Sequence, residues 1–262
     1  MKTGAHAFAF SIGLACAALA ASREARADEP LTGPPTDTQG KSVSPPAPVE
    51  GITPKLAGLN FIAGVAFVDF GPLNDRLASS GYPNKLPLTF PLLGGQGFGL
   101  FNRFTIGGSG SGFLSRSVSA PNNGEISASG AWGTVDVGYQ LVRVNGFFVA
   151  PVLSLGGYGL FANIHSKDED SFSDVLGSPA RGTTLTNRGV LAGLSVMANL
   201  IVLGKPSTVP NARSGLSLGL RLGGLYGIPY REWKADGVTI EGGPKFGLRG
   251  GYAALSLGVG TW

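Results

Sequence analysis

The feature of this sequence that most constrains its fold is a strict alternation of apolar side chains at every second position. From Leu216 to Leu222, leucine occupies every even position, while serine, glycine and arginine occupy the odd positions. Successive side chains of a β-strand point to opposite faces of a sheet, so this period predicts a strand with one leucine face and one small or polar face. The same period recurs in residues 132–141, 190–202 and 255–260. The chain is therefore expected to be all-β.

Glycine content supports an all-β chain. The sequence holds 43 glycines in 262 residues, about twice the usual 7%. Glycine is unfavourable inside helices, and no long stretch after the N-terminal region has helical periodicity. We count about eight candidate strands, at about residues 56–70, 88–100, 104–115, 132–141, 147–161, 190–202, 216–223 and 255–260.

The connections between these strands alternate in length. Short links are expected at 101–103, 143–146 and about 204–213, and long ones at about 71–87, 116–125, 162–184 and 227–247. Transmembrane barrels have short periplasmic turns and long extracellular loops. The alternation therefore predicts a closed antiparallel transmembrane β-barrel over residues 55–262.

The direction of the leucine face distinguishes a membrane barrel from a soluble one. A soluble barrel would bury its leucines and expose charge, but only 14% of this chain is charged. The candidate strands are also long enough for the roughly 9–11 residues that a tilted strand needs to cross a bilayer. We expect lipid-facing side chains at Val135, Val137, Leu194, Val196, Leu216, Leu218, Leu220, Leu222, Leu255 and Leu257.

The opposite faces of these strands carry polar residues. Asp136, Gln140, Asn199 and Arg221 are expected to point into the barrel. A buried charge without a partner is costly, so we predict that they form a structural polar network. A transport path along a glycine- and serine-lined interior is the alternative.

The N-terminus has the layout of a secretory signal peptide. Lys2 is followed by an apolar run, and Ala25 and Ala27 supply the small residues of a cleavage site, which predicts a signal peptide over 1–27. A retained anchor helix is the alternative, but the apolar run is short for roughly 20 spanning residues. Residues 28–54 are proline-rich and are expected to form a flexible periplasmic linker.

Composition argues against several function classes. Cleavage after Ala27 would leave 17 basic and 15 acidic residues and one histidine, His165. We see no basic cluster that tracks nucleic acid, and one imidazole does not make an ordinary zinc site, so neither nucleic acid nor a cofactor or metal is expected. Residues 165–171 contain histidine, serine and acids, the ingredients of a hydrolase. Adjacent residues on one loop rarely reach catalytic geometry, so we expect a non-enzymatic protein with a solvated acidic loop.

Aromatic and basic residues share the last long connection. Tyr230, Trp233 and Phe246 lie among Arg231, Lys234 and Lys245. Aromatic residues commonly form girdles at barrel rims, and a girdle is the expected role. Contact with lipopolysaccharide phosphates or an extracellular partner is the alternative.

Over about residues 55–262 the chain resembles small OmpA- and OmpX-like outer-membrane barrels. The residues that carry the resemblance are the segments 73–77, 81–83 and 241–244 and the terminal Trp262. The resemblance implies an outer-membrane protein of a Gram-negative bacterium, in contact with lipid and lipopolysaccharide. It also implies that Trp262 is an assembly signal for the barrel-assembly machinery. In that signal the aromatic shares a face with apolar residues, but here it would share one with Gly258 and Gly260. A bulge near Gly260 would reconcile the two faces, and otherwise the signal is imperfect.

The expected function is a structural or surface-interaction role in the outer membrane. A narrow channel or small-ligand carrier is the second hypothesis, and a lipid A-modifying enzyme is the third.

Overall fold

The computed structural model describes most of the chain after the predicted linker. The described residues are 56–80, 82, 84–114, 117–119, 124–144, 146–166, 182–206, 213–230, 233–240, 243–244 and 246–261. The predicted signal peptide with Ala25 and Ala27, the predicted linker and Trp262 lie outside them.

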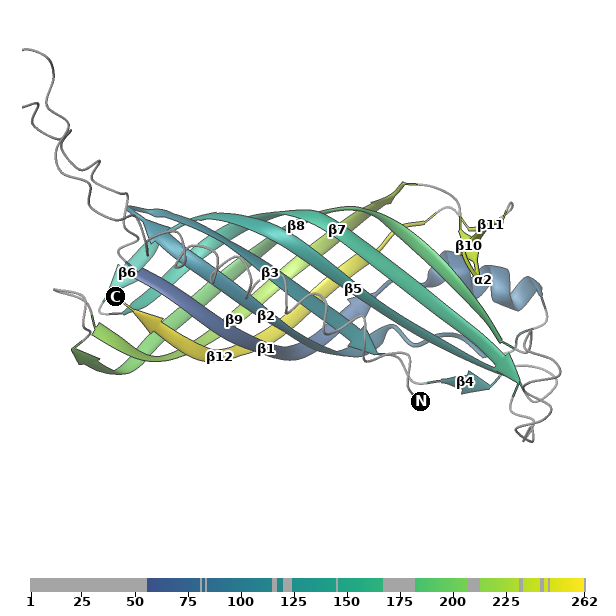
Figure 1. The fold of residues 1–262 in the computed structure, drawn as a ribbon, viewed down its shortest axis with the longest axis horizontal. Helices are drawn as coiled ribbons and strands as arrows, with labels where there is room; N and C mark the ends of the chain where they lie inside the picture. Colours follow the sequence, from purple (N-terminus) through teal and green to yellow (C-terminus); the bar gives the residue numbers. More distant parts are fainter. Residues whose placement is uncertain are drawn as a thin grey trace, which may run out of the picture. The chain divides into compact units, whose positions relative to one another are not determined.

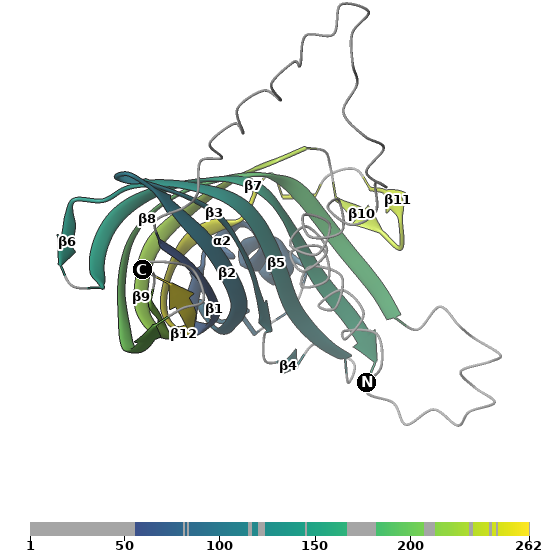
Figure 2. The ribbon, with the colours of Figure 1, turned by 60° about the vertical axis from the view of Figure 1, so that its left-hand side comes forward.

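Eight long strands form a closed ring in which every neighbouring pair is antiparallel (Figures 1 and 2). The ring closes where the first strand pairs with the last, from Ala57 opposite Thr261 to Val68 opposite Gly250. The predicted closed antiparallel barrel of eight strands is thus confirmed. Its strands are β1 (Leu56–Val68), β2 (Thr89–Phe101), β3 (Phe104–Leu114), β5 (Gly124–Tyr139), β7 (Phe147–Ser166), β8 (Gly182–Pro206), β9 (Arg213–Pro229) and β12 (Arg249–Thr261).

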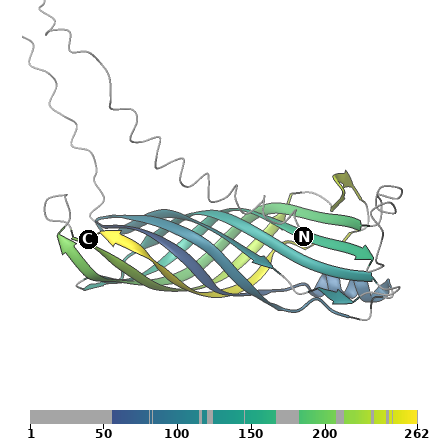
Figure 3. The same ribbon diagram turned by 60° about the horizontal axis from the view of Figure 1, so that its bottom comes forward.

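Short and long connections fall at opposite ends of the barrel. At the turn end, Asn102 and Arg103 join β2 to β3, with Asn102 at φ 58°, and β6 (Val142–Val144) pairs with the start of β7. At the loop end lie α2 (Gly71–Ser79), β4 (Val118–Ser119), β10 (Lys234–Ala235) and β11 (Val238–Thr239). All eight strands slant across the barrel (Figure 3).

Strands β5, β7, β8, β9 and β12 are longer than expected, and the longest are β7 and β8. β7 has 20 residues and β8 has 25, whereas β3 has 11. Their pairing runs from Phe147 opposite Leu200 to His165 opposite Gly182, and β10 extends it by pairing with β8. The outer face of this extension carries Thr184 and Thr186. Because apolar residues no longer alternate there, the leucine and valine pattern did not reveal the full strands.

Helix α2 lies in the long connection expected at about residues 71–87, where the sequence analysis identified no helix. Pro72 stands at its N-terminus and Gly71 N–H donates to Asp69 Oδ1 at 2.9 Å. Leu73 and Leu77, four residues apart, are both buried. This spacing is a helical signal, but nine residues are too few to show a period over several turns.

The loop end of the interior is filled by an apolar cluster, which α2 joins through its two leucines. Trp233 and Phe246 belong to this cluster and are each 3% exposed, so the prediction that they form a rim girdle is wrong. Trp233 satisfies its indole by donating Nε1–H to Pro244 O at 2.9 Å. The largest buried side chains of the cluster include Phe70, Phe90, Phe113, Leu86, Leu92, Ile126, Leu160, Leu191 and Leu248.

A second apolar cluster fills the interior toward the turn end. It consists of Leu56, Phe98, Leu100, Phe148, Ala150, Val152, Met197 and Ile201. The face of β2 that carries Phe90 and Phe98 therefore points inward, which explains why the polar Gln96 lies on the same face. Where both faces of a strand are apolar or small, alternation does not say which one faces in.

Of the two alternatives for the end of the last strand, the bulge near Gly260 is not found in the described residues. The pairing of β1 with β12 runs without a register shift from Val68 opposite Gly250 to Ala57 opposite Thr261, with Gly58 opposite Gly260. Gly260 is buried and Val259 is exposed. The alternation of inward and outward residues on β12 therefore continues without interruption to the end of the described strand.

Asn74 of α2 bonds both backbone groups of a residue in the connection that follows the helix. Asn74 donates Nδ2–H to Leu86 O at 3.2 Å and accepts from Leu86 N–H through Oδ1 at 2.8 Å. We predict that Asn74→Ala destabilises this segment by about 1–3 kcal/mol, because it leaves two buried backbone groups unpaired. Limited proteolysis of the refolded protein should show faster cleavage within residues 70–88. The exposed Asp75→Ala is the control, and equal cleavage of the two variants would contradict the prediction.

Candidate functional site

The outer surface of the barrel is a continuous apolar band. All ten side chains that were predicted to face lipid are exposed, from 37% for Leu216 to 67% for Leu255. Further exposed apolar residues on β1, β3, β7 and β12 extend the band, among them Leu59, Phe61, Ile106, Leu153, Leu155 and Val259. Monomeric soluble proteins rarely expose large contiguous apolar patches. An exterior of this kind suits hydrocarbon, in which a barrel must also be closed because water is not available to pair backbone groups.

Aromatic residues border the band at both ends. At the turn end, the rings of Phe104 and Tyr139 pack edge to face with their centroids 5.4 Å apart. At the loop end, Tyr226 and Tyr230 are exposed, and Arg249 lies over the Tyr226 ring at 4.8 Å. This is the arrangement of aromatic girdles at the two interfaces of a membrane barrel.

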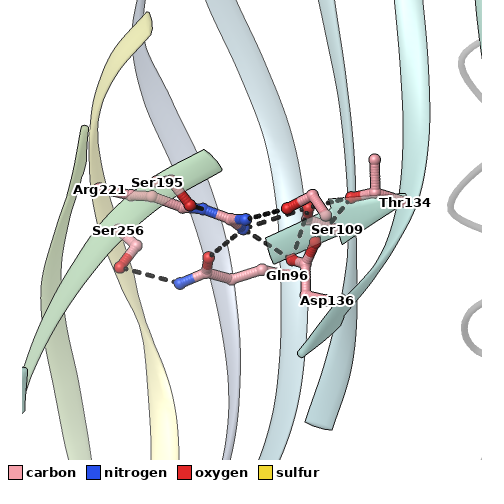
Figure 4. A network of polar contacts seen from close by, with 8 residues as sticks. Gln96, Ser109, Thr134, Asp136, Ser195, Arg221 and Ser256 are labelled. Carbon is pink, nitrogen blue, oxygen red and sulfur yellow. Dashed lines mark hydrogen bonds and ion pairs between the residues drawn. The ribbon is translucent and has the colours of Figure 1, made fainter. Parts of the chain in front are cut away.

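A single arginine lies at the centre of the barrel interior. Arg221 of β9 is 4% exposed and forms an ion pair with Asp136 of β5, with Nη1 and Oδ2 2.8 Å apart. β5 and β9 are three strands apart around the ring, so this pair crosses the interior (Figure 4). Arg221 Cζ also lies 5.9 Å from the centre of the Tyr252 ring.

The remaining donors of Arg221 are directed to other strands. Nε donates to Ser195 Oγ at 3.1 Å and Nη2 to Ser154 Oγ at 3.0 Å. Nη1 also lies 3.2 Å from Ser109 Oγ and 3.4 Å from Gln96 Oε1. One guanidinium thus binds side chains from five other strands, which its planar array of five N–H donors permits.

Asp136 is satisfied from both sides. Its Oδ2 accepts from Ser109 Oγ at 2.9 Å in addition to Arg221, and its Oδ1 accepts from Thr134 Oγ1 at 2.9 Å. A buried ion pair is tolerated when its geometry is good and its remaining polar atoms are hydrogen-bonded. Both conditions hold here.

Together these residues form what we call the polar layer, to which every barrel strand contributes. Strand register explains it: Asn60, Gln96, Ser109 and Thr134 lie opposite one another on successive strands, and Asp136 lies opposite Ser154. The members, in ring order, are Asn60 (β1), Gln96 (β2), Ser109 (β3), Thr134 and Asp136 (β5), Ser154 (β7), Ser195 and Asn199 (β8), Ser217 and Arg221 (β9) and Ser256 (β12).

The four residues that we expected inside the barrel are all buried, but only three of them belong to the polar layer. Asn199 joins it because its Oδ1 accepts from Ser217 Oγ at 3.3 Å and from Asn60 Nδ2 at 3.4 Å. Gln140 lies outside it, and neither polar atom of its side chain has a hydrogen-bond partner among the described residues. Sequence reasoning missed the serines and Gln96, because a serine or glutamine among glycines carries no charge signal.

The interior near the polar layer has little free volume. A cavity of about 10 Å³ is lined in part by Gln96, Thr105 and Asp136, which is room for one water molecule. Thr105 Oγ1 is buried and has no partner among the described residues, so one water would satisfy it. The interior near the polar layer is thus packed like a protein core, and this cavity has no space for a ligand larger than water.

The described residues offer little reactive chemistry. No group of three or more potential metal ligands occurs among them. His165 lies at the end of β7, and residues 167–171 of the proposed hydrolase segment lie outside the described part of the chain. No helix in the described part is long and apolar enough to cross a membrane.

Comparison with known proteins gives likenesses of fold only. No protein-family model matches the chain, and no curated protein matches it. Among solved structures, it is similar to Ail, the attachment invasion locus protein of Yersinia pestis, at 11% identity and a TM-score of 0.44, over 79% of this chain and 99% of Ail. A major outer membrane protein of Thermus thermophilus matches at 12% identity and 0.37, over 79% and 99%. The outer membrane protease OmpT of Escherichia coli matches at 9% and 0.27, over 79% and 94%.

At these identities and TM-scores the matches add nothing to what the strand pairing establishes. The conclusion from the chain itself is a small antiparallel β-barrel with an apolar exterior and a packed interior.

The ion pair gives a direct test of how the polar layer acts. We predict that Arg221→Met alone destabilises the barrel by about 3–5 kcal/mol, because it leaves the buried Asp136 carboxylate without its cation. The double variant Arg221→Met with Asp136→Leu should recover most of that loss. Urea unfolding of refolded protein in detergent micelles, followed by tryptophan fluorescence, measures both. A single variant as stable as the unchanged protein would contradict a structural role for the pair.

Proposed function

We propose that the protein is an integral β-barrel of the bacterial outer membrane with a structural or surface-interaction role and no catalytic activity. The observation that carries the proposal is the combination of an apolar exterior on all eight strands with an interior filled by side chains. Such a barrel holds a fixed shape in lipid and presents its loop end to the outside.

The loop end has the form of a surface for interaction. The wall made by β5, β7 and β8 extends beyond the apolar band, and its outer face is polar: Thr184 Oγ1 donates to Asn163 Oδ1 at 2.9 Å. The β10–β11 hairpin, closed by Asp236 and Gly237 at φ 47° and 88°, lies against this wall and exposes Val238. These elements support an extracellular partner as the interaction target.

The packed interior weighs against the channel hypothesis. The apolar clusters lie on both sides of the polar layer, and the cavity beside that layer holds one water molecule at most. Refolded protein in a planar lipid bilayer should therefore give no reproducible single-channel conductance. Steady conductance steps would overturn the structural role in favour of a channel.

The enzyme hypothesis is tested separately. Cells that express the protein should contain the same lipid A species as cells that express its His165→Ala variant. A lipid A change that this substitution abolishes would replace the proposal with a catalytic one.

Membrane insertion itself is tested by fractionation of cells and by electrophoresis. Folded membrane barrels resist unfolding by detergent until they are heated, so an unheated sample should migrate differently from a heated one. The protein is expected in the outer-membrane fraction with such a shift. Recovery as a folded, detergent-free soluble protein would contradict the proposal. Recognition of Trp262 by the barrel-assembly machinery stays a prediction.

The orientation of β9 in lipid has its own test. Leu220→Arg should destabilise the folded barrel by roughly 2–4 kcal/mol if the side chain meets the bilayer near its midplane. Thr186→Arg is the matched control, because Thr186 is on the outer face of β8 beyond the apolar band and an arginine there would meet water or headgroups. The measurement is urea unfolding in lipid vesicles. Equal stability of the two variants would mean that the apolar band does not lie in hydrocarbon.

A further inference from the structure

A group of basic and aromatic side chains lies on the outer face of the barrel, at the loop-end border of the apolar band. We call it the outer basic patch and define it as Arg188, Tyr226, Tyr230, Lys234 and Arg249. All five side chains are exposed, and they come from β8, from β9 and the residue after it, from β10 and from β12, which lie side by side around this part of the wall.

The pairing of the strands shows how the members of the outer basic patch are arranged. Arg249 lies directly opposite Tyr226, and Tyr230 N–H donates to Arg188 O at 2.9 Å. Lys234 lies opposite Thr186, and directly opposed residues point to the same face of a sheet. Because Thr186 and Arg188 share the outer face of β8, Lys234 shares it too.

Tyr226 holds the guanidinium of Arg249 in place. Arg249 Cζ lies 4.8 Å from the centre of the Tyr226 ring and Nη2 donates to Tyr226 Oη at 3.2 Å. Stacking of this kind fixes the plane of the guanidinium. It leaves further N–H donors, out of five, for a ligand.

Two exposed carboxylates near the patch, Asp236 and Asp69, accept hydrogen bonds from backbone N–H groups. Asp236 Oδ1 accepts from Thr184 N–H at 3.0 Å, and Asp69 Oδ1 accepts from Gly71 N–H at 2.9 Å. Within the described part of the chain, none of Arg188, Lys234 and Arg249 forms a salt bridge with a carboxylate. The three basic side chains are therefore not held in ion pairs by the described residues.

The patch is continuous with an apolar stripe that a lipid chain can follow. On the outer face of β9, Ile228 lies between Tyr226 and Tyr230, and beyond Tyr226 and Gly224 follow the exposed Leu222, Leu220, Leu218 and Leu216. Fixed positive charge with tyrosines immediately above exposed aliphatic side chains matches a molecule with phosphate at one end and acyl chains at the other. Phosphate is an anion that the paired N–H donors of arginine recognise strongly.

We propose that the outer basic patch binds the phosphorylated headgroup of a glycolipid of the outer leaflet, with the acyl chains of that lipid lying along the leucines of β9. The inference rests on the proposed outer-membrane location. Arg249 and Arg188 bind phosphate oxygens, Lys234 adds a further cation, and Tyr226 and Tyr230 lie at the level of the headgroup.

The test is lipid binding by the refolded full-length chain in neutral detergent, measured by native mass spectrometry. The probe is diphosphoryl lipid A, and the dephosphorylated lipid and inorganic phosphate are the comparison ligands. The double variant Arg188→Gln with Arg249→Gln is expected to bind diphosphoryl lipid A roughly 10-fold more weakly. The matched control, Arg76→Gln with Lys85→Gln, removes two exposed charges from the loop between β1 and β2 and should bind as the unchanged chain does.

Each outcome decides between explanations. The unchanged chain should prefer the diphosphoryl form over the dephosphorylated one by a similar factor, and millimolar phosphate should not compete. Equal binding of both lipids, equal binding by the double variant and the unchanged chain, or competition by free phosphate would each overturn the proposal. Because heat-modifiable migration is recorded for every variant, failure of the barrel to fold in detergent would count against the proposed membrane function, separately from the patch.

Discussion

Backbone hydrogen bonding in a medium without water is the constraint on which the rest of the structure depends. An open sheet edge in hydrocarbon leaves N–H and C=O groups unpaired at a cost of several kcal/mol each. The pairing of β1 with β12 removes both edges, because Leu56–Val68 meets Arg249–Thr261 along its length. Once the ring is closed, each strand has one face toward lipid and one toward a narrow interior, and the side-chain alternation follows.

Eight strands make an interior only wide enough for side chains, and the chain fills it in three levels. Apolar clusters lie toward the loop end and the turn end, and the polar layer lies between them. Charge in such a place must be paired, and Arg221 is paired with Asp136 while its other donors bind serines and an amide. Since every strand supplies a member of the layer, the network links the whole ring and favours one register over its neighbours.

The barrel could be predicted from the sequence because a strand between lipid and a packed interior needs an apolar residue at every second position. The leucines of β9 and the valines of β5 show this alternation directly. Asp136 and Arg221 indicated which face of β5 and of β9 points into the barrel, because a charged side chain is costly in lipid. Helix α2 and the inward aromatics of β2 were not predictable in this way: nine residues show no period, and both faces of β2 carry apolar or small residues, so alternation does not show that Phe90 and Phe98 point inward. Trp233 was misplaced for the same reason, because an aromatic near a rim packs inward or outward according to tertiary contacts that the local sequence does not contain.

The most direct test of the outward apolar face is the oxygen accessibility of nitroxide labels along β9 in lipid vesicles, measured by electron paramagnetic resonance. The chain contains one cysteine, Cys16, so single cysteines at residues 216–222 are readily compared once Cys16 is replaced. Oxygen dissolves preferentially in hydrocarbon, and we predict high accessibility at Leu216, Leu218, Leu220 and Leu222 and low accessibility at Ser217 and Gly219. Uniform accessibility along the strand, or high values at the odd positions, would contradict an apolar face that lies in lipid.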